Sequence, residues 1–287
     1  MQIGVALGNL GLAMGGPIDP IDHADLVYDI ADAAEALGFH SVWAGDHLAL
    51  PRTPTTPYPY GTGAMLPADA SILDPFAVLA ALAGRTTRIR LGFGVLVAPY
   101  RHPLIVAKLV ASIDALSRGR VILGVGTGWL PEEFAAVGAD FHERGRATDD
   151  TLRYLRRAFT DGEVDGMTLL PTPVQRPGPP IWVGGQADAA MRRAVAHADA
   201  WDAPYVDTGA LREGVARLRR FCAEAGRDPT SIGVSVRGLA AADVDNELLD
   251  AYDALGVTHL GVILPVWEPA RAVEELEELA QRTPDHV

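Results

Sequence analysis

Apolar positions follow two alternating patterns along the chain. Short continuous apolar runs, such as Ile3 to Leu7 and Ile89 to Val97, are typical of strands buried on both faces. Longer segments such as Ala24 to Leu37 repeat apolar residues every three or four positions, which is typical of helices. The other predicted strands are 39–44, 121–125, 181–185, 198–201, 232–236 and 259–264, and the other main predicted helices are 74–83, 102–116, 147–159, 187–196, 210–225, 247–255 and 270–280.

The order of these elements predicts the fold. Strand and helix alternate about eight times, which indicates a single (β/α)8 TIM barrel domain over residues 1–287. In such a barrel the site lies at the carboxyl ends of the strands. A doubly wound open sheet is the alternative, but no glycine fingerprint follows the first strand. The proline-rich segments 48–73 and 161–180 are predicted to be irregular insertion loops at the C-terminal face.

Segment 48–73 carries Tyr58 and Tyr60. We expect it to form a lid or a wall of the substrate pocket, because long loops in compact domains are commonly functional. A surface loop without a function is the alternative.

Composition and charge narrow the class of partner. The 287 residues carry a net charge of −13 and no block of basic residues, which argues against a nucleic-acid partner. No apolar run reaches membrane-spanning length, so we expect no membrane partner and a small-molecule substrate. Met1 leads directly into a strand with no signal-like leader, and Cys222 is the single cysteine. We therefore expect a cytoplasmic protein without an internal disulfide, with Cys222 as a buried thiol.

The predicted strand ends provide a map of candidate chemistry. His47 is the first candidate, because a neutral imidazole gives or takes a proton near physiological pH, and Asp46 could orient it or pair with a ligand. Alternatively, Asp46 caps the following loop and His47 packs beneath it. The other histidines show no metal-ligand spacing, so no metal site is predicted. Further strand-end residues are Gly94, Val95, Thr127, Gly128, Trp129, Gly184, Gly185, Gln186, Trp201 and Arg237.

A glycine-rich turn follows the fourth predicted strand. Gly124, Gly126 and Gly128 allow a sharp turn, and Pro131, Glu132 and Glu133 suit the first turn of a helix. A helix that begins here offers free N–H groups to a phosphate. A tight turn without a ligand explains the same residues.

Four segments together resemble a known family. They are Ala-Leu-Gly-Phe-His-Ser-Val-Trp-Ala-Gly-Asp-His (36–47), Ile-Arg-Leu-Gly-Phe-Gly-Val-Leu-Val-Ala-Pro-Tyr-Arg-His-Pro (89–103), Ser-Arg-Gly-Arg-Val-Ile-Leu-Gly-Val-Gly-Thr-Gly-Trp (117–129) and Pro-Pro-Ile-Trp-Val-Gly-Gly (179–185). In this order they resemble the luciferase-like superfamily of barrel oxidoreductases, in its deazaflavin (coenzyme F420)-dependent branch. The likeness extends to about Trp201, and the last third is generic barrel.

This resemblance implies roles for residues. Asp46 and His47 would face the deazaflavin and the substrate, with His47 as the acid or base. Gly94-Val95 would form a bulge behind the ring with a non-prolyl cis peptide bond. The remaining cofactor contacts would come from Gly126, Thr127, Gly128 and Trp129 and, at the phosphate, from Val183, Gly184, Gly185 and Gln186, while Trp43, Tyr58, Tyr60, Trp201 and Arg237 would line the substrate pocket.

Three departures from the family pattern matter. Trp129 stands where some deazaflavin enzymes carry a catalytic Glu, so that acid is missing and the pocket is narrowed. Segment 161–180 is shorter than in relatives, which predicts a more open rim. The basic cluster of relatives that oxidise sugar phosphates is absent, so such a substrate is not supported.

The functional hypotheses follow from this resemblance. The first is a deazaflavin-dependent oxidoreductase that transfers a hydride to or from a small organic substrate. A reduced-FMN-dependent monooxygenase and a non-catalytic flavin-binding barrel are the alternatives. A lyase or isomerase is set aside, because the only lysine, Lys108, lies within a predicted helix. The family also implies a homodimer, for which the apolar faces of 24–37 and 75–83 could serve unless they face the barrel.

Overall fold

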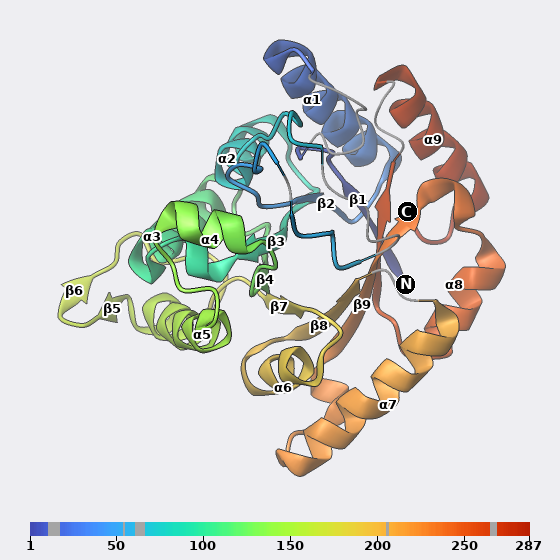
Figure 1. The fold of residues 1–287 in the computed structure, drawn as a ribbon. Helices are drawn as coiled ribbons and strands as arrows, with labels where there is room; N and C mark the ends of the chain where they lie inside the picture. The colour runs from blue at the N-terminus through green and yellow to red at the C-terminus, as the bar shows by residue number, and fades with distance from the viewer. Residues whose placement is uncertain (11–17, 54, 61–66, 205–206, 265–268) are drawn as a thin grey trace.

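A closed barrel of eight parallel strands forms the centre of the computed structural model (Figure 1). The structure describes residues 1–10, 18–53, 55–60, 67–204, 207–264 and 269–287. Around the barrel the strands follow the order β1-β10-β9-β8-β7-β4-β3-β2, so that β1 pairs with both β2 and β10. They are β1 (Gln2–Ala6), β2 (Ser41–Ala44), β3 (Arg90–Val97), β4 (Val121–Gly126), β7 (Ile181–Gly184), β8 (Ala200–Pro204), β9 (Gly233–Ala240) and β10 (His259–Ile263). The predicted barrel is confirmed, and closure excludes the open sheet.

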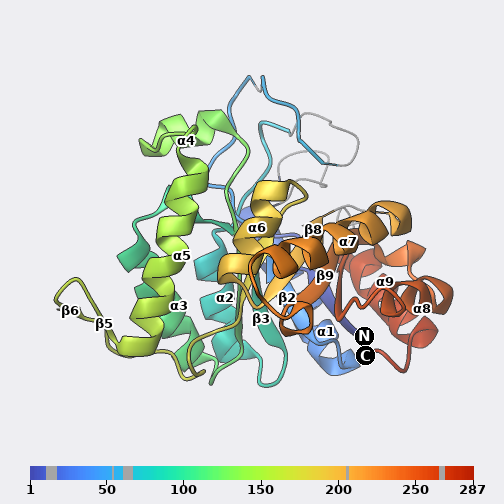
Figure 2. The same ribbon diagram turned by 90° about the horizontal axis from the view of Figure 1, so that it is seen from below.

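Helices surround the strands on the outside (Figure 1), except that the short helix α4 (Pro131–Val137) lies at one end of the barrel (Figure 2). They are α1 (Pro20–Leu37), α2 (Pro75–Arg85), α3 (Pro103–Leu116), α4 (Pro131–Val137), α5 (Arg144–Asp161), α6 (Asp188–His197), α7 (Thr208–Glu224), α8 (Asn246–Asp253) and α9 (Pro269–Arg282). The apolar faces of α1 and α2 belong to the buried core, through residues such as Leu26, Ile30 and Leu79. Of the two roles considered for these faces, the structure therefore assigns them to the barrel.

Some element limits differ from the prediction for local reasons. Helix α1 begins four residues earlier than predicted, because the Asp19 carboxylate accepts from the Ile21 amide and Pro20 suits the first position. The sixth barrel strand, β8, runs later than the predicted 198–201. Segment 161–180 is not wholly irregular, since it contains an antiparallel hairpin of β5 (Glu163–Val164) and β6 (Met167–Thr168).

Two properties of the described residues bear on the predicted class of protein. Cys222 is a free, fully buried thiol, as predicted. In the described part of the chain, every helix is too short or too polar to span a bilayer.

Candidate functional site at the carboxyl ends of the strands

His47 and Glu133 form the centre of the candidate site. His47 follows β2, and Glu133 lies in the first turn of α4, which begins beyond β4. The His47 Nδ1 atom lies 2.6 Å from Glu133 Oε2, and the two side chains are 7% and 2% exposed. The barrel brings together these residues, 86 positions apart, because both follow the carboxyl end of a strand.

Three more donors hold the Glu133 carboxylate. The Leu48 and Ala49 amides donate to Oε1 at 2.7 and 3.2 Å, and the Tyr100 hydroxyl donates to Oε2 at 2.9 Å. Burial works against ionisation of Glu133, but the hydrogen bonds from His47 and the two amides outweigh it and lower the pKa of the carboxyl. Glu133 is therefore an ionised acceptor that fixes both His47 and the start of the long loop.

The described part of segment 48–73 lies against α4 and the His47 ring. The Thr55 hydroxyl donates to Glu132 at 2.6 Å, which ties the loop to α4 a second time. The Trp129 ring stands edge-on to His47 at 5.8 Å, and the Tyr58 ring meets Trp129 at 5.3 Å. Tyr60 adjoins Tyr58 at 5.6 Å. These aromatic residues form one wall beside His47, which agrees with the predicted position of the loop; residues 54 and 61–66 of it lie outside the described residues.

Asp46 does not share the environment of His47. Its carboxylate accepts two hydrogen bonds from Arg101, at 2.7 and 3.0 Å, and one from the Val97 amide at 2.9 Å. Arg101 also bonds Asp74, the cap of α2. Because the Asp46 side chain is 0% exposed and its oxygens face protein donors, the predicted contact with cofactor or substrate is wrong. Asp46 instead joins β2 to the end of β3.

The Gly94–Val95 peptide bond is cis, as the family resemblance implied. The Val95 side chain lies against three glycines of neighbouring strands: a Cβ at Gly126 would come within 2.6 Å of it, one at Gly184 within 3.2 Å and one at Gly124 within 3.5 Å. Gly126 and Gly184 therefore make room for Val95, whereas Gly124 makes room for the Phe93 carbonyl oxygen, 2.1 Å from the position that a Cβ on Gly124 would take. Thr127, Gly128 and Trp129 follow β4 and are half-buried, at the same end of the barrel.

An ion pair lies at the barrel mouth on the side opposite β2. Arg237 on β9 pairs with Asp202 on β8, and their side chains are 19% and 2% exposed. The guanidinium also lies 5.7 Å from the Trp43 ring. Burial lowers the pKa of Arg237 to about 10, while the Tyr58 and Tyr60 phenols work in the opposite direction, so both tyrosines lie near it.

Beneath this pair, polar groups are buried inside the barrel. The Trp43 indole donates to Ser41 Oγ at 2.8 Å, and His259 contacts Ser41 and Ser235 at 3.0 Å each. Burial, with the His40 and Arg237 charges, lowers the pKa of His259 well below its usual range, so its ring is neutral. Trp43, which the family resemblance placed in the lining of the substrate pocket, is thus buried inside the barrel, where its side chain packs against Gly92 and Gly94.

Trp201 lies outside the barrel, so its prediction as a substrate-pocket residue is wrong. Its indole donates to the Gly185 carbonyl at 2.7 Å, and its ring packs against Gly214 of α7. Successive residues of a strand point to opposite faces, and Asp202 takes the inward position. The strand-end position alone did not show which residues of β8 point into the barrel and which point out of it.

The β7–α6 connection only partly matches the predicted phosphate contacts. Val183 is buried within β7, and the Gly185 amide donates to the Asp202 carbonyl at 3.1 Å, so both serve the sheet. The Gln186 side chain donates to the Pro204 carbonyl. Helix α6 begins two residues later without a side-chain cap. Its first-turn amides, rather than that of Gly185, are the groups suited to an anion.

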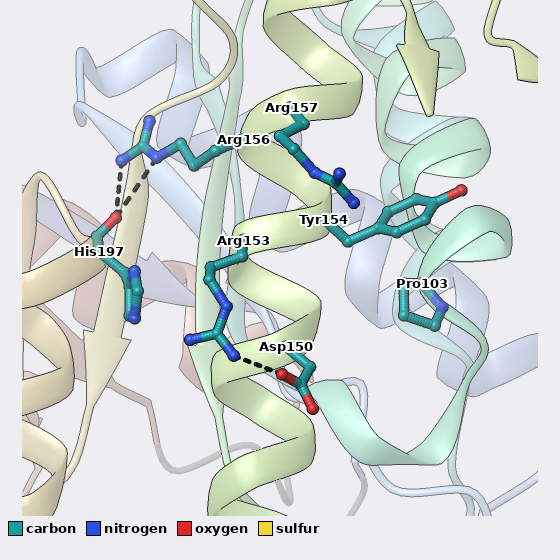
Figure 3. Close-up of a pocket in the computed structure, with 7 residues that line it drawn as sticks. All are labelled: Pro103, Asp150, Arg153, Tyr154, Arg156, Arg157 and His197. Atoms are coloured by element: carbon teal, nitrogen blue, oxygen red, sulfur yellow. Dashed lines mark hydrogen bonds and ion pairs between the residues drawn. The ribbon is translucent and has the colours of Figure 1, made fainter. Parts of the chain in front are cut away.

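A separate hollow of about 670 Å³ lies outside the barrel, between α3, α5 and α6 (Figure 3). Its three arginines already have partners: Arg153 turns to Asp150, Arg156 bonds the His197 carbonyl and Asp199, and Arg157 pairs with Asp165. None of the predicted site residues lines it. Among the residues that the structure describes, no group of three or more His, Cys, Asp or Glu side chains could hold a metal.

A model of the luciferase-like monooxygenase family matches residues 1–284. The chain belongs to this family. It is 32% identical over 254 residues to a phthiodiolone/phenolphthiodiolone dimycocerosates ketoreductase of Mycobacterium kansasii, covering 82% of this chain and 69% of that protein. An F420-dependent secondary alcohol dehydrogenase in complex with an F420-acetone adduct has a similar fold (TM-score 0.71, 17% identity, 97% of both chains). So does a type II Baeyer-Villiger monooxygenase of Pseudomonas putida in complex with FMN (TM-score 0.73, 16% identity, 100% and 98% of the two chains).

In this luciferase-like chain, sequence reasoning missed three residues of the site: Glu133, Tyr100 and Asp202. In the sequence Glu133 stands out only as a favourable residue for a helix start, although that helix follows a strand end. Position 129 holds no acid, but the Glu133 carboxylate, four positions further along the chain, reaches His47. The signal was present in the barrel prediction, since any acidic residue near a strand end is a possible partner for His47.

Proposed function

We propose that this luciferase-like protein is an oxidoreductase that uses coenzyme F420 and a small organic substrate, with His47 as the acid or base. The observation that carries the proposal is the His47–Glu133 contact at the carboxyl ends of the strands. Ionised Glu133 can only accept, so Nδ1 of His47 must carry a proton. In the neutral ring, Nε2 is then the free acceptor.

His47 can therefore move a proton at Nε2. When the substrate is an alcohol, Nε2 takes the hydroxyl proton, and the Glu133 carboxylate stabilises the resulting imidazolium. In the reverse direction the imidazolium returns the proton to the oxygen. Trp129 packs beside the His47 ring, with Tyr58 behind it, and together they exclude water from this transfer. A bound deazaflavin would supply the two-electron hydride acceptor or donor.

The residues present fit such a cofactor in two ways. The uncapped first turn of α6 suits its phosphate, and Gly185, at φ +129°, brings the chain so close to α6 that a Cβ would lie 2.8 Å from Ala190. The half-buried residues from Thr127 to Trp129, with Gly94 and Val95, remain the candidates to contact the ring.

A reduced-FMN monooxygenase is the second candidate, and the family description favours it. The same α6 turn would hold an FMN phosphate, and proteins of this fold are found with either cofactor. The proposal for the deazaflavin therefore depends on the four sequence segments together with the His47–Glu133 pair. The M. kansasii ketoreductase supports reduction of a carbonyl group as the reaction type.

A cofactor titration tests the proposal. Purified protein is titrated with coenzyme F420 and separately with FMN, following tryptophan fluorescence, because Trp129 lies 5.8 Å from His47 and should be quenched. Tighter binding of the deazaflavin is expected. Tighter binding of FMN, with oxygen uptake by the reduced complex, would establish the monooxygenase instead, and binding of neither would refute both.

His47→Ala then separates an enzyme from a passive flavin-binding barrel. With a substrate found by a screen of ketones and secondary alcohols, turnover should fall by about 10²–10⁴-fold, the usual contribution of a positioned acid or base. Cofactor affinity should not change. His142→Ala is the matched control, since His142 is exposed on the loop after α4. An unchanged turnover in His47→Ala would contradict its role.

A homodimer and a cytoplasmic location remain predictions. Helix α3 supports the first, because its apolar side chains Ile105, Leu109 and Leu116 stay exposed, unlike the buried faces of α1 and α2. Sedimentation of the wild type and of Leu109→Glu tests this assembly: the variant should be monomeric.

A further inference from the structure

The Arg237–Asp202 pair has features that a purely structural ion pair does not require. Arg237 stands at the barrel mouth, and Gly238, which follows it at φ +94°, lies where the register of β9 against β10 shifts. Such bulges re-aim side chains and are frequent next to active sites. The Arg237 Nη1 atom lies 3.0 Å from the position that a Cβ on Gly94 would take, beside the cis peptide. Any side chain at Gly94 would therefore meet the guanidinium.

The guanidinium keeps hydrogen-bonding capacity. Arginine has five N–H donors. Among the residues that the structure describes, Asp202 is the single ion-pair partner of Arg237, and no hydrogen-bond acceptor is found for its Nε or Nη1 groups. The side chain is 19% exposed, and Tyr58 and Tyr60, from the wall beside His47, lie close enough to influence its charge. The remaining N–H donors of Arg237 therefore border the same space as the aromatic wall beside His47.

The charge balance decides which ligand would fit these donors. Asp202 compensates the positive charge of Arg237 and is itself 2% exposed, so water screens the pair poorly. The ionised Glu133 adds a second negative charge behind His47. A ligand carboxylate or phosphate at Arg237 would also meet the Asp202 carboxylate, whereas an uncharged oxygen would accept a hydrogen bond without that repulsion.

We propose that Arg237 is a specificity-determining residue that binds the uncharged oxygen of a ketone or secondary alcohol substrate, and that Asp202 keeps carboxylate and phosphate compounds out. The inference rests on the proposed function, since it names the substrate class of that same site. It assigns to Asp202 the role of a positioning residue, which acts through Arg237 and not by touching the substrate.

Two probes of equal shape test the selectivity: para-fluoroacetophenone, which is uncharged, and para-fluorobenzoate, an anion. Their dissociation constants are measured by fluorine NMR on the full chain, with and without the cofactor that binds. The wild type should bind the ketone at least about tenfold more tightly than the benzoate. In Asp202→Asn the uncompensated Arg237 should improve benzoate binding by about tenfold and reverse the order. Glu224→Gln is the control for net charge, because it removes the anion of an exposed pair with Arg192.

The double variant Asp202→Asn/Arg237→Gln keeps the test valid if the single variant fails to fold, since it leaves no unpaired buried charge. It should bind both probes within about twofold of each other. A wild type that binds neither probe, or prefers the benzoate, overturns the inference, and so does an unchanged preference in these variants. The ratios on the cofactor-free chain are independent of cofactor binding, so a failure here is distinct from a failure of the proposed function.

Discussion

The Nδ1 atom of His47 lies 2.6 Å from Oε2 of Glu133, a contact that no motif in the sequence predicts. The carboxylate belongs to a helix, whereas the imidazole begins the long loop after β2. Since Glu133 also accepts from the Leu48 and Ala49 amides, one side chain sets both the tautomer of His47 and the position of the loop. The proposed proton chemistry of His47 and the position of the loop therefore depend on the same residue, Glu133.

Glu133→Gln should lower turnover on the order of 10²-fold, because a positioned acid or base contributes about that much. The amide NH₂ of the glutamine would face His47 Nδ1 and favour the tautomer with its proton on Nε2. Nitrogen NMR of the imidazole detects this tautomer change, and turnover is measured with the substrate found by screening. Glu132→Gln, which changes only the bond to Thr55 and Thr56, should leave the tautomer unaltered. An unaltered tautomer in Glu133→Gln would refute the assignment.

Asp46→Asn should act on stability and not on cofactor binding. Breaking a buried ion pair by removing one charge costs about 3–5 kcal/mol, and Arg101 would lose its buried partner. Asp32→Asn, which breaks the solvent-exposed pair with Arg85, should leave the free energy of unfolding nearly unchanged. Urea unfolding measures both. If Asp46→Asn were as stable as the wild type but no longer bound the cofactor, Asp46 would return to the ligand site.

The periodicity of apolar residues predicted the barrel because each strand and helix is long enough to carry its own pattern. The strand-end map then followed from topology, and it placed His47, Gly94, Thr127 and Arg237 at the correct end. What it could not supply was the direction of each side chain. Trp201 and Asp202 are neighbours on β8, and their opposite orientations depend on the register of the closed barrel.

The sequence also could not predict which charged residues pair with one another. The strand-end position and the family resemblance indicated that Asp46 faces a ligand, but its carboxylate accepts from Arg101, 55 positions away. Glu133 likewise contacts His47, although the two residues are 86 positions apart. Such pairings depend on distances of a few ångströms between separate elements, which spacing along the chain does not encode.

Gly214 and Gly84 provide a matched test of the position of Trp201. A Cβ at Gly214 of α7 would lie 2.6 Å from the Trp201 ring, whereas one at Gly84 of α2 meets nothing within 4 Å. Gly214→Ala should therefore destabilise the protein by about 1–3 kcal/mol through overpacking. Gly84→Ala should stabilise it by up to about 1 kcal/mol, because alanine favours the helix. Equal effects of the two substitutions in thermal or urea unfolding would contradict the outward position of Trp201.

Because it contains buried histidines, the protein should have a lower free energy of unfolding in mild acid than at neutral pH. Burial lowers the pKa of His40 to about 4 from its usual 6.5, with the nearby Arg90 charge acting in the same direction. Between these values the unfolded chain binds a proton that the folded chain refuses, so the free energy of unfolding decreases as pH falls through this window. For His40 alone the loss approaches about 3 kcal/mol at pH 4, and His259 acts in the same direction.

His40→Gln isolates this contribution, because glutamine does not titrate. Loss of the His40 contact with Ser41 shifts the unfolding free energy equally at every pH, so the informative quantity is the difference between wild type and variant. That difference should change by about 2 kcal/mol between pH 7 and pH 4.5, in the direction that favours the variant in acid. His142→Gln, at an exposed position, should follow the wild type throughout. If the free energy of unfolding depended on pH in the same way in the wild type and in His40→Gln, the His40 ring would take up its proton equally well in the folded and the unfolded chain. This result would contradict the lowered pKa of His40.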